Sequence, residues 1–372
     1  MLRSSPRALN AVFAPAPLLL APLLSLALVA CTDDGEPDLT ASASQQASAR
    51  SGSRAPRLLL STSRGNSVVE LSQSGSGAPR VLVPAGSGGL EDPDAMTIGP
   101  DGKLYVSSGH SPETSAILRY DARTGAFLDV FASGHGLNRP YGLTFGPDGL
   151  LYVSSFRSDE LFRFDAHTGA FVDILARGDG QPGGLNGPNA LLFGPDGKLY
   201  ISTEGSVAGE FPGLPSEVLR LDVDTGESTV FIAQPEPAPS SFGFVSLLGL
   251  AFGPSCRAHH PGSCDLFVSD FANDVRRFDG RTGALKAQLD TNYTGTQPSS
   301  NFIGGLAFGV GSRLFVAGFD LAADGNPGAV LRYDGFSGQP LPAHGNAGAQ
   351  FVAPTAALSR PIGILAINPQ HD

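Results

Sequence analysis

Aspartate, asparagine and glutamate residues recur at equivalent points of an internal repeat. Such residues can bind cations or transfer protons. Asp94 and Asn189 stand just before short hydrophobic runs, whereas Glu204 and Asp270 stand at the ends of such runs. Carboxylate and amide oxygens are the ligands that Ca²⁺ prefers, and a bound divalent ion polarises a carbonyl group. We therefore treat these four residues as candidate ligands of a divalent cation, Ca²⁺ or Zn²⁺. The competing interpretation is that they only hydrate the mouth of a channel.

Other candidates lie beside these residues in the repeat. His110 and Tyr141 are candidates for acid–base catalysis, and Arg157 and Asp320 are candidates for ligand binding. A general acid or base needs a titratable group with a shifted pKa in a closed pocket, which a sequence alone does not reveal. No G-x-S-x-G motif occurs in the sequence, so nothing supports a serine nucleophile.

The N-terminal region indicates export and membrane anchoring. Two arginines precede an apolar run, residues 11–30, that three prolines interrupt, which suits a cleaved signal better than a spanning helix. The run ends Leu28-Val29-Ala30-Cys31, which resembles the lipobox of bacterial lipoproteins. The resemblance implies lipidation of Cys31 after removal of residues 1–30, and a location in the cell envelope facing the periplasm or exterior. An ordinary signal with an incidental cysteine is the alternative.

A polar segment follows, and residues 31–56 are predicted to be a flexible tether because they contain few large apolar side chains. Cys256 and Cys264 are predicted to form a disulfide, since an exported protein meets oxidising conditions. A Cys₂His₂ metal site with His259 and His260 is the alternative, although adjacent histidines would struggle to face one ion.

Composition favours an all-β protein. The 372 residues include 48 glycines and 30 prolines, which indicates many turns and few long helices. The formal net charge is −11, and it becomes more negative without the signal segment, which argues against a nucleic-acid partner.

Two turn motifs organise the chain from residue 57 to residue 372. The first is G-P-D-G, in which proline fixes φ, aspartate bonds nearby amides and the last glycine accepts positive φ. Its copies, two of them degraded, begin at Gly99, Gly146, Gly194, Gly253 and Gly309. The second is D-x-x-T-G, whose aspartates we interpret as structural because they recur in every repeat; its copies begin at Asp121, Asp165, Asp222, Asp279 and, with serine for threonine, Asp334.

Each complete unit reads as four short strands; in the second unit these are residues 142–145, 150–154, 161–165 and 170–175. Tandem four-stranded units are typical of a β-propeller. Residues 362–367 offer one innermost strand, and residues 57–61, 68–71 and 80–84 offer three outer ones. We therefore predict six antiparallel blades, the last shared between the N- and C-terminal strands, which removes the open edge of the ring.

Segments of these units resemble known propeller repeats. Residues 266–279, reading L-F-V-S-D-F-A-N-D-V-R-R-F-D, are similar to NHL repeats, and residues 194–204, reading G-P-D-G-K-L-Y-I-S-T-E, are similar to streptogramin-lyase and gluconolactonase-like propellers. The likeness spans Arg57 to Asn368 and implies the propeller fold. Streptogramin lyases usually have tryptophan at the position of Tyr200, and no catalytic histidine and acid can be transferred, so lyase activity is not implied.

The strand topology predicts which face of the propeller carries the functional site. The regular turns share one face, and the variable loops share the other with the crossovers between blades, where recognition usually lies. We expect a lipid-anchored binding or scaffolding module that presents this face to a protein, glycan or small molecule. The alternative is a divalent-metal-dependent lactonase, hydrolase or lyase with its site at the central opening.

Overall fold

The computed structural model describes residues 55–205, 213–256 and 264–368. The predicted signal segment, the predicted lipidation site Cys31 and nearly all of the predicted tether lie outside these residues, as do His259 and His260. No helix in the described ranges is long and apolar enough to cross a membrane.

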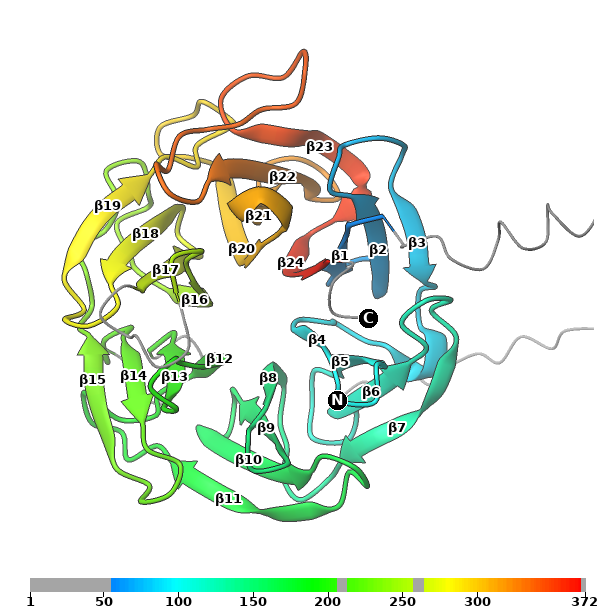
Figure 1. Cartoon of the computed structure of the whole chain (residues 1–372), viewed down its shortest axis with the longest axis vertical. Helices are drawn as coiled ribbons and strands as arrows, with labels where there is room; N and C mark the ends of the chain where they lie inside the picture. The colour runs from blue at the N-terminus through cyan, green and yellow to red at the C-terminus, as the bar shows by residue number, and fades with distance from the viewer. Residues whose placement is uncertain (1–54, 206–212, 257–263, 369–372) are drawn as a thin grey trace, which may run out of the picture. The chain divides into compact units, whose positions relative to one another are not determined.

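The described residues form six four-stranded antiparallel sheets arranged in a ring (Figure 1), so the predicted six-bladed propeller is confirmed. Blade 1 contains β4 (Met96–Ile98), β5 (Leu104–Ser108), β6 (Ala116–Tyr120) and β7 (Phe127–Ser133). Blade 2 contains β8 (Pro140–Phe145), β9 (Leu150–Ser155), β10 (Glu160–Asp165) and β11 (Phe171–Arg177). Blade 3 contains β12 (Pro188–Phe193), β13 (Leu199–Thr203), β14 (Val218–Leu221) and β15 (Ser228–Ile232).

Blade 4 contains β16 (Leu247–Phe252), β17 (Asp265–Asp270), β18 (Asp274–Asp279) and β19 (Leu285–Leu289). Blade 5 contains β20 (Asn301–Phe308), β21 (Arg313–Asp320), β22 (Pro327–Asp334) and β23 (Gln350–Ser359). Two short 3-10 turns, η1 (Ser87–Gly89) and η3 (Val310–Ser312), interrupt the loops. In every blade the first of these strands lies nearest the centre of the ring (Figure 1).

Blade 6 joins the two ends of the repeat array, as predicted. Its order is β24-β1-β2-β3, with β24 (Pro361–Ile367) innermost, followed by β1 (Arg57–Thr62), β2 (Ser67–Ser72) and β3 (Arg80–Val83). The buried Gln73 side chain fastens this junction, because its amide donates to the backbone oxygens of Arg57 and Ile367 at 3.0 and 3.3 Å. Its carbonyl oxygen accepts the Val310 amide of blade 5 at 2.9 Å, so one residue links both termini to the neighbouring blade.

The two turn motifs do the structural work predicted for them. In the second G-P-D-G turn, Asp148 accepts the Leu150 amide at 3.2 Å and the hydroxyl of buried Tyr152 at 2.7 Å. In the next turn of blade 2, Asp165 accepts the Thr168 amide and hydroxyl, both at 2.8 Å. The hydrogen bond from the Thr168 side chain lowers the pKa of this exposed carboxyl, which is therefore a turn former and not a catalytic group.

Serine hydroxyls connect neighbouring blades around the channel. Ser154 accepts the Gly142 amide at 2.6 Å and donates to the Asn189 carbonyl of the next blade at 2.7 Å. A Cβ on Gly142 would stand 2.1 Å from that same carbonyl oxygen, so the close approach of the two inner strands requires glycine. Equivalent hydroxyls lie at Ser61, Ser107, Ser202 and Ser269. The inner strands are thus fixed around the channel by hydrogen bonds as well as by packing.

Blade 4 contains a buried ionic cluster. Arg276, only 1% exposed, donates to Asp274 at 2.7 Å and lies 3.3 Å from an oxygen of Asp270. The same guanidinium donates to the Glu236 carbonyl at 2.8 Å, which anchors the crossover between β15 and β16. Burial raises the pKa of Asp274 to about 6, although the neighbouring Arg276 opposes that shift.

The disulfide predicted between Cys256 and Cys264 is present and joins the two ends of the segment between β16 and β17.

Candidate functional site

A pocket of about 240 Å³ lies at the channel mouth on the face of the variable loops. Blades 1, 2 and 6 contribute Asp92, Arg139 and Arg360 from residues just before their innermost strands. The other lining residues are Ser63, Asp94, Tyr141, Phe156, Arg157, Glu204, Leu248, Phe271 and Ile362. The pocket therefore combines three arginines, three carboxyl groups and an aromatic wall.

The structure brings together part of the site predicted from the sequence. Asp94, Tyr141, Arg157 and Glu204 all line the pocket. Asn189 does not line it but lies behind Glu204, to which its amide donates. The second oxygen of Glu204 accepts the Ser246 hydroxyl at 3.2 Å. Glu204 is therefore held in one orientation by two neighbouring blades.

Burial disfavours the ionised form of both carboxyl groups on the pocket floor. Asp94 is only 9% exposed, and its carboxyl group accepts no hydrogen bond from any residue in the described ranges. Burial, reinforced by the Asp92 and Glu204 carboxylates, holds the pKa of Asp94 well above its usual range. Burial also raises the pKa of Glu204 to about 7, against the hydrogen bonds from Asn189 and Ser246. These shifts reduce the negative charge that the pocket presents near neutral pH.

Tyr141 forms part of the aromatic wall. Its ring centre lies 4.5 Å from that of Phe156, and the Arg139 guanidinium stands 5.0 Å from the Tyr141 ring. Burial, with the nearby Glu204 carboxylate, holds the pKa of Tyr141 well above its ordinary value. Its hydroxyl is therefore a hydrogen-bond donor at physiological pH and not a base.

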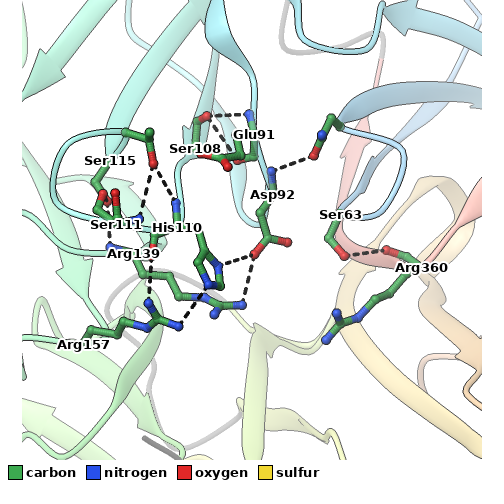
Figure 2. A network of polar contacts seen from close by, with 12 residues as sticks. Ser63, Glu91, Asp92, Ser108, His110, Ser111, Ser115, Arg139, Arg157 and Arg360 are labelled. Atoms are coloured by element: carbon green, nitrogen blue, oxygen red, sulfur yellow. Dashed lines mark hydrogen bonds and ion pairs between the residues drawn. The ribbon is translucent and has the colours of Figure 1, made fainter. Parts of the chain in front are cut away.

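A polar network forms the rim of the pocket (Figure 2). Asp92 accepts the Arg139 guanidinium at 3.1 Å and lies 3.4 Å from Nδ1 of His110. Arg157 donates to the His110 carbonyl at 2.9 Å and lies 3.2 Å from Nε2 of the same imidazole. Because Arg157 can only donate, Nδ1 carries the hydrogen that faces Asp92. His110 is 50% exposed and orients two pocket residues without lining the pocket itself.

Three charged rim residues have a backbone conformation that favours glycine. Asp92, Arg139 and Arg360 have φ of 41°, 55° and 50°, and each precedes a proline, which in blades 2 and 6 is the first residue of the innermost strand. Blade 3 has Gly187, with φ of 57°, at the same point. A left-handed non-glycine residue costs on the order of 1 kcal/mol, and such strain concentrates at functional sites. Sequence alignment of the blades missed these residues, although the dipeptides Asp-Pro and Arg-Pro were a usable signal.

Two of the three arginines have no acidic partner. Arg139 is paired with Asp92, whereas neither Arg157 nor Arg360 forms an ion pair with any residue that the structure describes. The Arg360 guanidinium makes no hydrogen bond within the described ranges and lies 5.5 Å from the Phe319 ring. Arg157 donates to His110 but has no carboxylate partner, whereas the hydrogen-bond donors of the Arg360 guanidinium are not used by any residue that the structure describes.

Asp270 and Asp320, which the sequence suggested for this site, do not line the pocket. Asp270 accepts the Ser246 and Ala272 amides at 2.8 and 3.0 Å and faces Arg276 inside blade 4. Asp320 accepts the Ala322 amide of its own loop at 3.0 Å. Successive side chains of a strand point to opposite sides, and Asp270 follows Ser269 by one residue whereas Glu204 follows Ser202 by two. The residue equivalent to Glu204 is Phe271, which does line the pocket.

The donor set does not fit a divalent cation. The two oxygens of Glu204 are already engaged by Asn189 and Ser246, and Asp270 is turned away. Positive charge from Arg139 and Arg360 reaches both Asp94 and Glu204, and it would oppose a cation bound between them. Among the described residues, no three His, Cys, Asp or Glu side chains form a group that could hold a metal.

The opposite end of the channel has a different character. Large aliphatic side chains line it, one from each innermost strand: Met96, Leu143, Leu191, Leu250, Leu306 and Ile364. Charged groups that could recognise a polar ligand are therefore concentrated at one mouth.

Fold and site together define a six-bladed propeller with a charged, aromatic-walled pocket at one mouth. Comparison with protein-family models and with curated protein sequences finds no match. Solved structures do match, the first being a chain of the nidogen/laminin complex, with a TM-score of 0.56 and 12% identity over 84% of this chain and 98% of that one.

Virginiamycin B lyase from Staphylococcus aureus matches with a TM-score of 0.50 and 14% identity, over 86% of this chain and 93% of that one. A protein of unknown function from Bacteroides caccae matches with a TM-score of 0.56 and 12% identity, over 85% and 100% of the two chains. The predicted likeness to streptogramin-lyase-like propellers is thus confirmed at the level of the fold.

Proposed function

We propose that this protein is a membrane-tethered binding module that holds a small organic anion in its mouth pocket. The observation that carries the proposal is the pair Arg157 and Arg360, two arginines that line the pocket without an acidic partner among the described residues. Guanidinium groups bind carboxylates and phosphates through charge-assisted hydrogen bonds. The raised pKa values of Asp94 and Glu204 support the proposal, because they reduce the negative charge that would repel an anion in the pocket.

Calorimetric titration of the full-length protein in detergent with succinate and with inorganic phosphate tests the binding. Arg360→Gln is expected to weaken the binding of the favoured anion about tenfold or more, since hydrogen bonds to charged groups contribute about 1.5–3 kcal/mol. Arg281→Gln, which alters an exposed arginine in a blade 4 turn, is the matched control and should bind as the parent does. Equal affinity in the two variants, or no saturable heat with either anion, would contradict the proposal.

Tethering is a separate part of the proposal and has its own test. Cys31→Ala removes the residue expected to carry the lipid, so the protein should move from the membrane to the soluble fraction after cell lysis. Immunoblotting of the two fractions measures the shift, and Cys256→Ala with Cys264→Ala controls for loss of a cysteine elsewhere. Retention of Cys31→Ala in membranes that alkaline carbonate does not extract would rule out a lipid anchor at this residue.

A second candidate, hydrolysis or elimination on a lactone or cyclic ester, is favoured by one observation. Glu204, with a pKa raised to about 7 by burial, lies in a pocket with the Tyr141 hydroxyl, and a group of that pKa suits acid–base catalysis. This version needs no metal ion, which agrees with the donor set. Turnover of a lactone by the purified protein that Glu204→Gln abolishes would support it.

A further inference from the structure

Aromatic side chains form a strip on the face beside the mouth pocket. Phe242 and Phe244 lie on the crossover between β15 and β16 and are 54% and 41% exposed. Their ring centres lie 6.1 and 6.5 Å from that of Phe302, which is buried beneath them. We call these three residues the phenylalanine strip.

The strip continues into the pocket. The Phe302 ring centre lies 4.9 Å from that of Phe271, which lines the pocket. It also lies 5.9 Å from the ring centre of Phe319, above which the Arg360 guanidinium stands at 5.5 Å. Neighbouring rings therefore connect the exposed Phe242 and Phe244, through the buried Phe302, to the pocket wall at Phe271 and to the Phe319 ring beside Arg360.

This arrangement is costly unless something covers it. Two exposed phenylalanines side by side leave apolar area in contact with water, and exposed apolar patches mark interaction sites. Their crossover is not loose, because the buried Arg276 holds the Glu236 carbonyl within it. The exposed part of the strip, Phe242 and Phe244, is thus an apolar surface that is connected through Phe302 and Phe271 to a cationic pocket. A molecule with an anionic group and a flat apolar group would satisfy both surfaces at once.

We infer that the anion bound in the mouth pocket carries an aromatic ring, which packs on the phenylalanine strip while its carboxylate binds Arg360. This inference rests on the proposed binding function and adds the chemical class of the ligand. Aromatic rings favour offset or edge-to-face contact with other rings, and Phe242 and Phe244 are both exposed enough to make such a contact.

The sequence supplies a convenient assay because it contains no tryptophan. Indole-3-propionate, which has a carboxylate and an aromatic ring, can therefore be followed by its own fluorescence as the full-length protein is added. Indole-3-propionamide has the ring without the charge, and succinate has the charge without the ring. We expect the indole acid to bind most tightly and the amide to bind at least about tenfold more weakly.

Phe242→Ala separates the two parts of the contact. It should weaken indole-3-propionate binding about tenfold, the effect of losing one buried ring contact, and leave succinate binding unchanged. Val172→Ala is the matched control, since Val172 is an exposed apolar residue on the outer strand of blade 2. A second comparison uses the Cys31→Ala protein with and without Phe242→Ala. If Phe242→Ala weakens its association with lipid vesicles but does not change indole acid binding, the strip is a membrane contact and the inference is overturned.

The remaining outcomes distinguish this inference from the function on which it rests. If succinate and the indole acid bind equally and Phe242→Ala affects neither, the ligand class is wrong while anion binding stands. If the amide binds as tightly as the acid, the carboxylate contact with Arg360 is wrong. If neither acid binds, both proposals fail.

Discussion

Arg276→Leu is expected to destabilise the protein by about 3–5 kcal/mol, because removing one member of a buried ionic cluster leaves the others without compensation. Asp270 and Asp274 would remain in blade 4 at 1% and 2% exposure without their cation. The Glu236 carbonyl would also lose its donor, so the crossover that carries Phe242 and Phe244 should loosen.

Urea unfolding followed by circular dichroism measures this loss. Arg80→Leu is the control, since Arg80 is 54% exposed where it pairs with Glu70, and surface pairs contribute up to about 1 kcal/mol. Adding Asp270→Asn and Asp274→Asn to Arg276→Leu should recover part of the stability, because the uncompensated charges are then gone. A loss no larger than that of Arg80→Leu would show that the cluster is not held as the structure indicates.

Glu204→Gln is expected to make the protein more stable than the parent at alkaline pH. The folded-state pKa of Glu204, about 7, lies above its ordinary value of 4.5, so the folded protein keeps this proton to higher pH than the unfolded chain does. Stability from this group is therefore present at low pH and is lost as the pH rises through the interval from 4.5 to about 7. A shift of this size, discounted for partial exposure, corresponds to about 2 kcal/mol.

The measurement is the difference in unfolding free energy between Glu204→Gln and the parent at about pH 5 and about pH 8, where the expected change follows from linkage. The difference should favour the variant by about 2 kcal/mol more at the higher pH. Comparing the two proteins cancels the contribution of Asp274, whose pKa is also raised, whereas the pKa of Asp94, which Glu204 helps to raise, changes together with Glu204. Glu227→Gln, at an exposed turn position, is the control and should show no such pH dependence. A constant difference would mean that Glu204 is ionised throughout this range.

The fold was predictable because its signals are local. Each G-P-D-G and D-x-x-T-G turn is formed by hydrogen bonds within a few residues, as at Asp148 and Asp165, so short sequence windows contain the whole cause. The shared sixth blade followed from counting strands, and the disulfide followed from two nearby cysteines in a chain that the sequence predicts to be exported.

The site was only partly predictable because two of its causes are not local. Asp92, Arg139 and Arg360 have a left-handed backbone conformation where they line the pocket. The only sign of that conformation in the sequence is a charged residue before a proline. Arg360 also reaches blade 1 only when the ring closes. Asp270 shows a second cause, since it lies one strand position from the residue equivalent to Glu204 and its side chain therefore faces Arg276 inside blade 4.

The order in which the chain is synthesised determines when the shared blade 6 can be completed. The strand β24 is made last, yet it occupies the innermost place in the blade that β1 begins. Until Pro361–Ile367 has left the ribosome, β1 lacks its inner neighbour and the ring has a gap. Closure of blade 6 therefore waits until β24 has been synthesised after all the other strands that the structure describes. A stop codon only a few residues before Pro361 would accordingly disable the blade at the opposite end of the sequence.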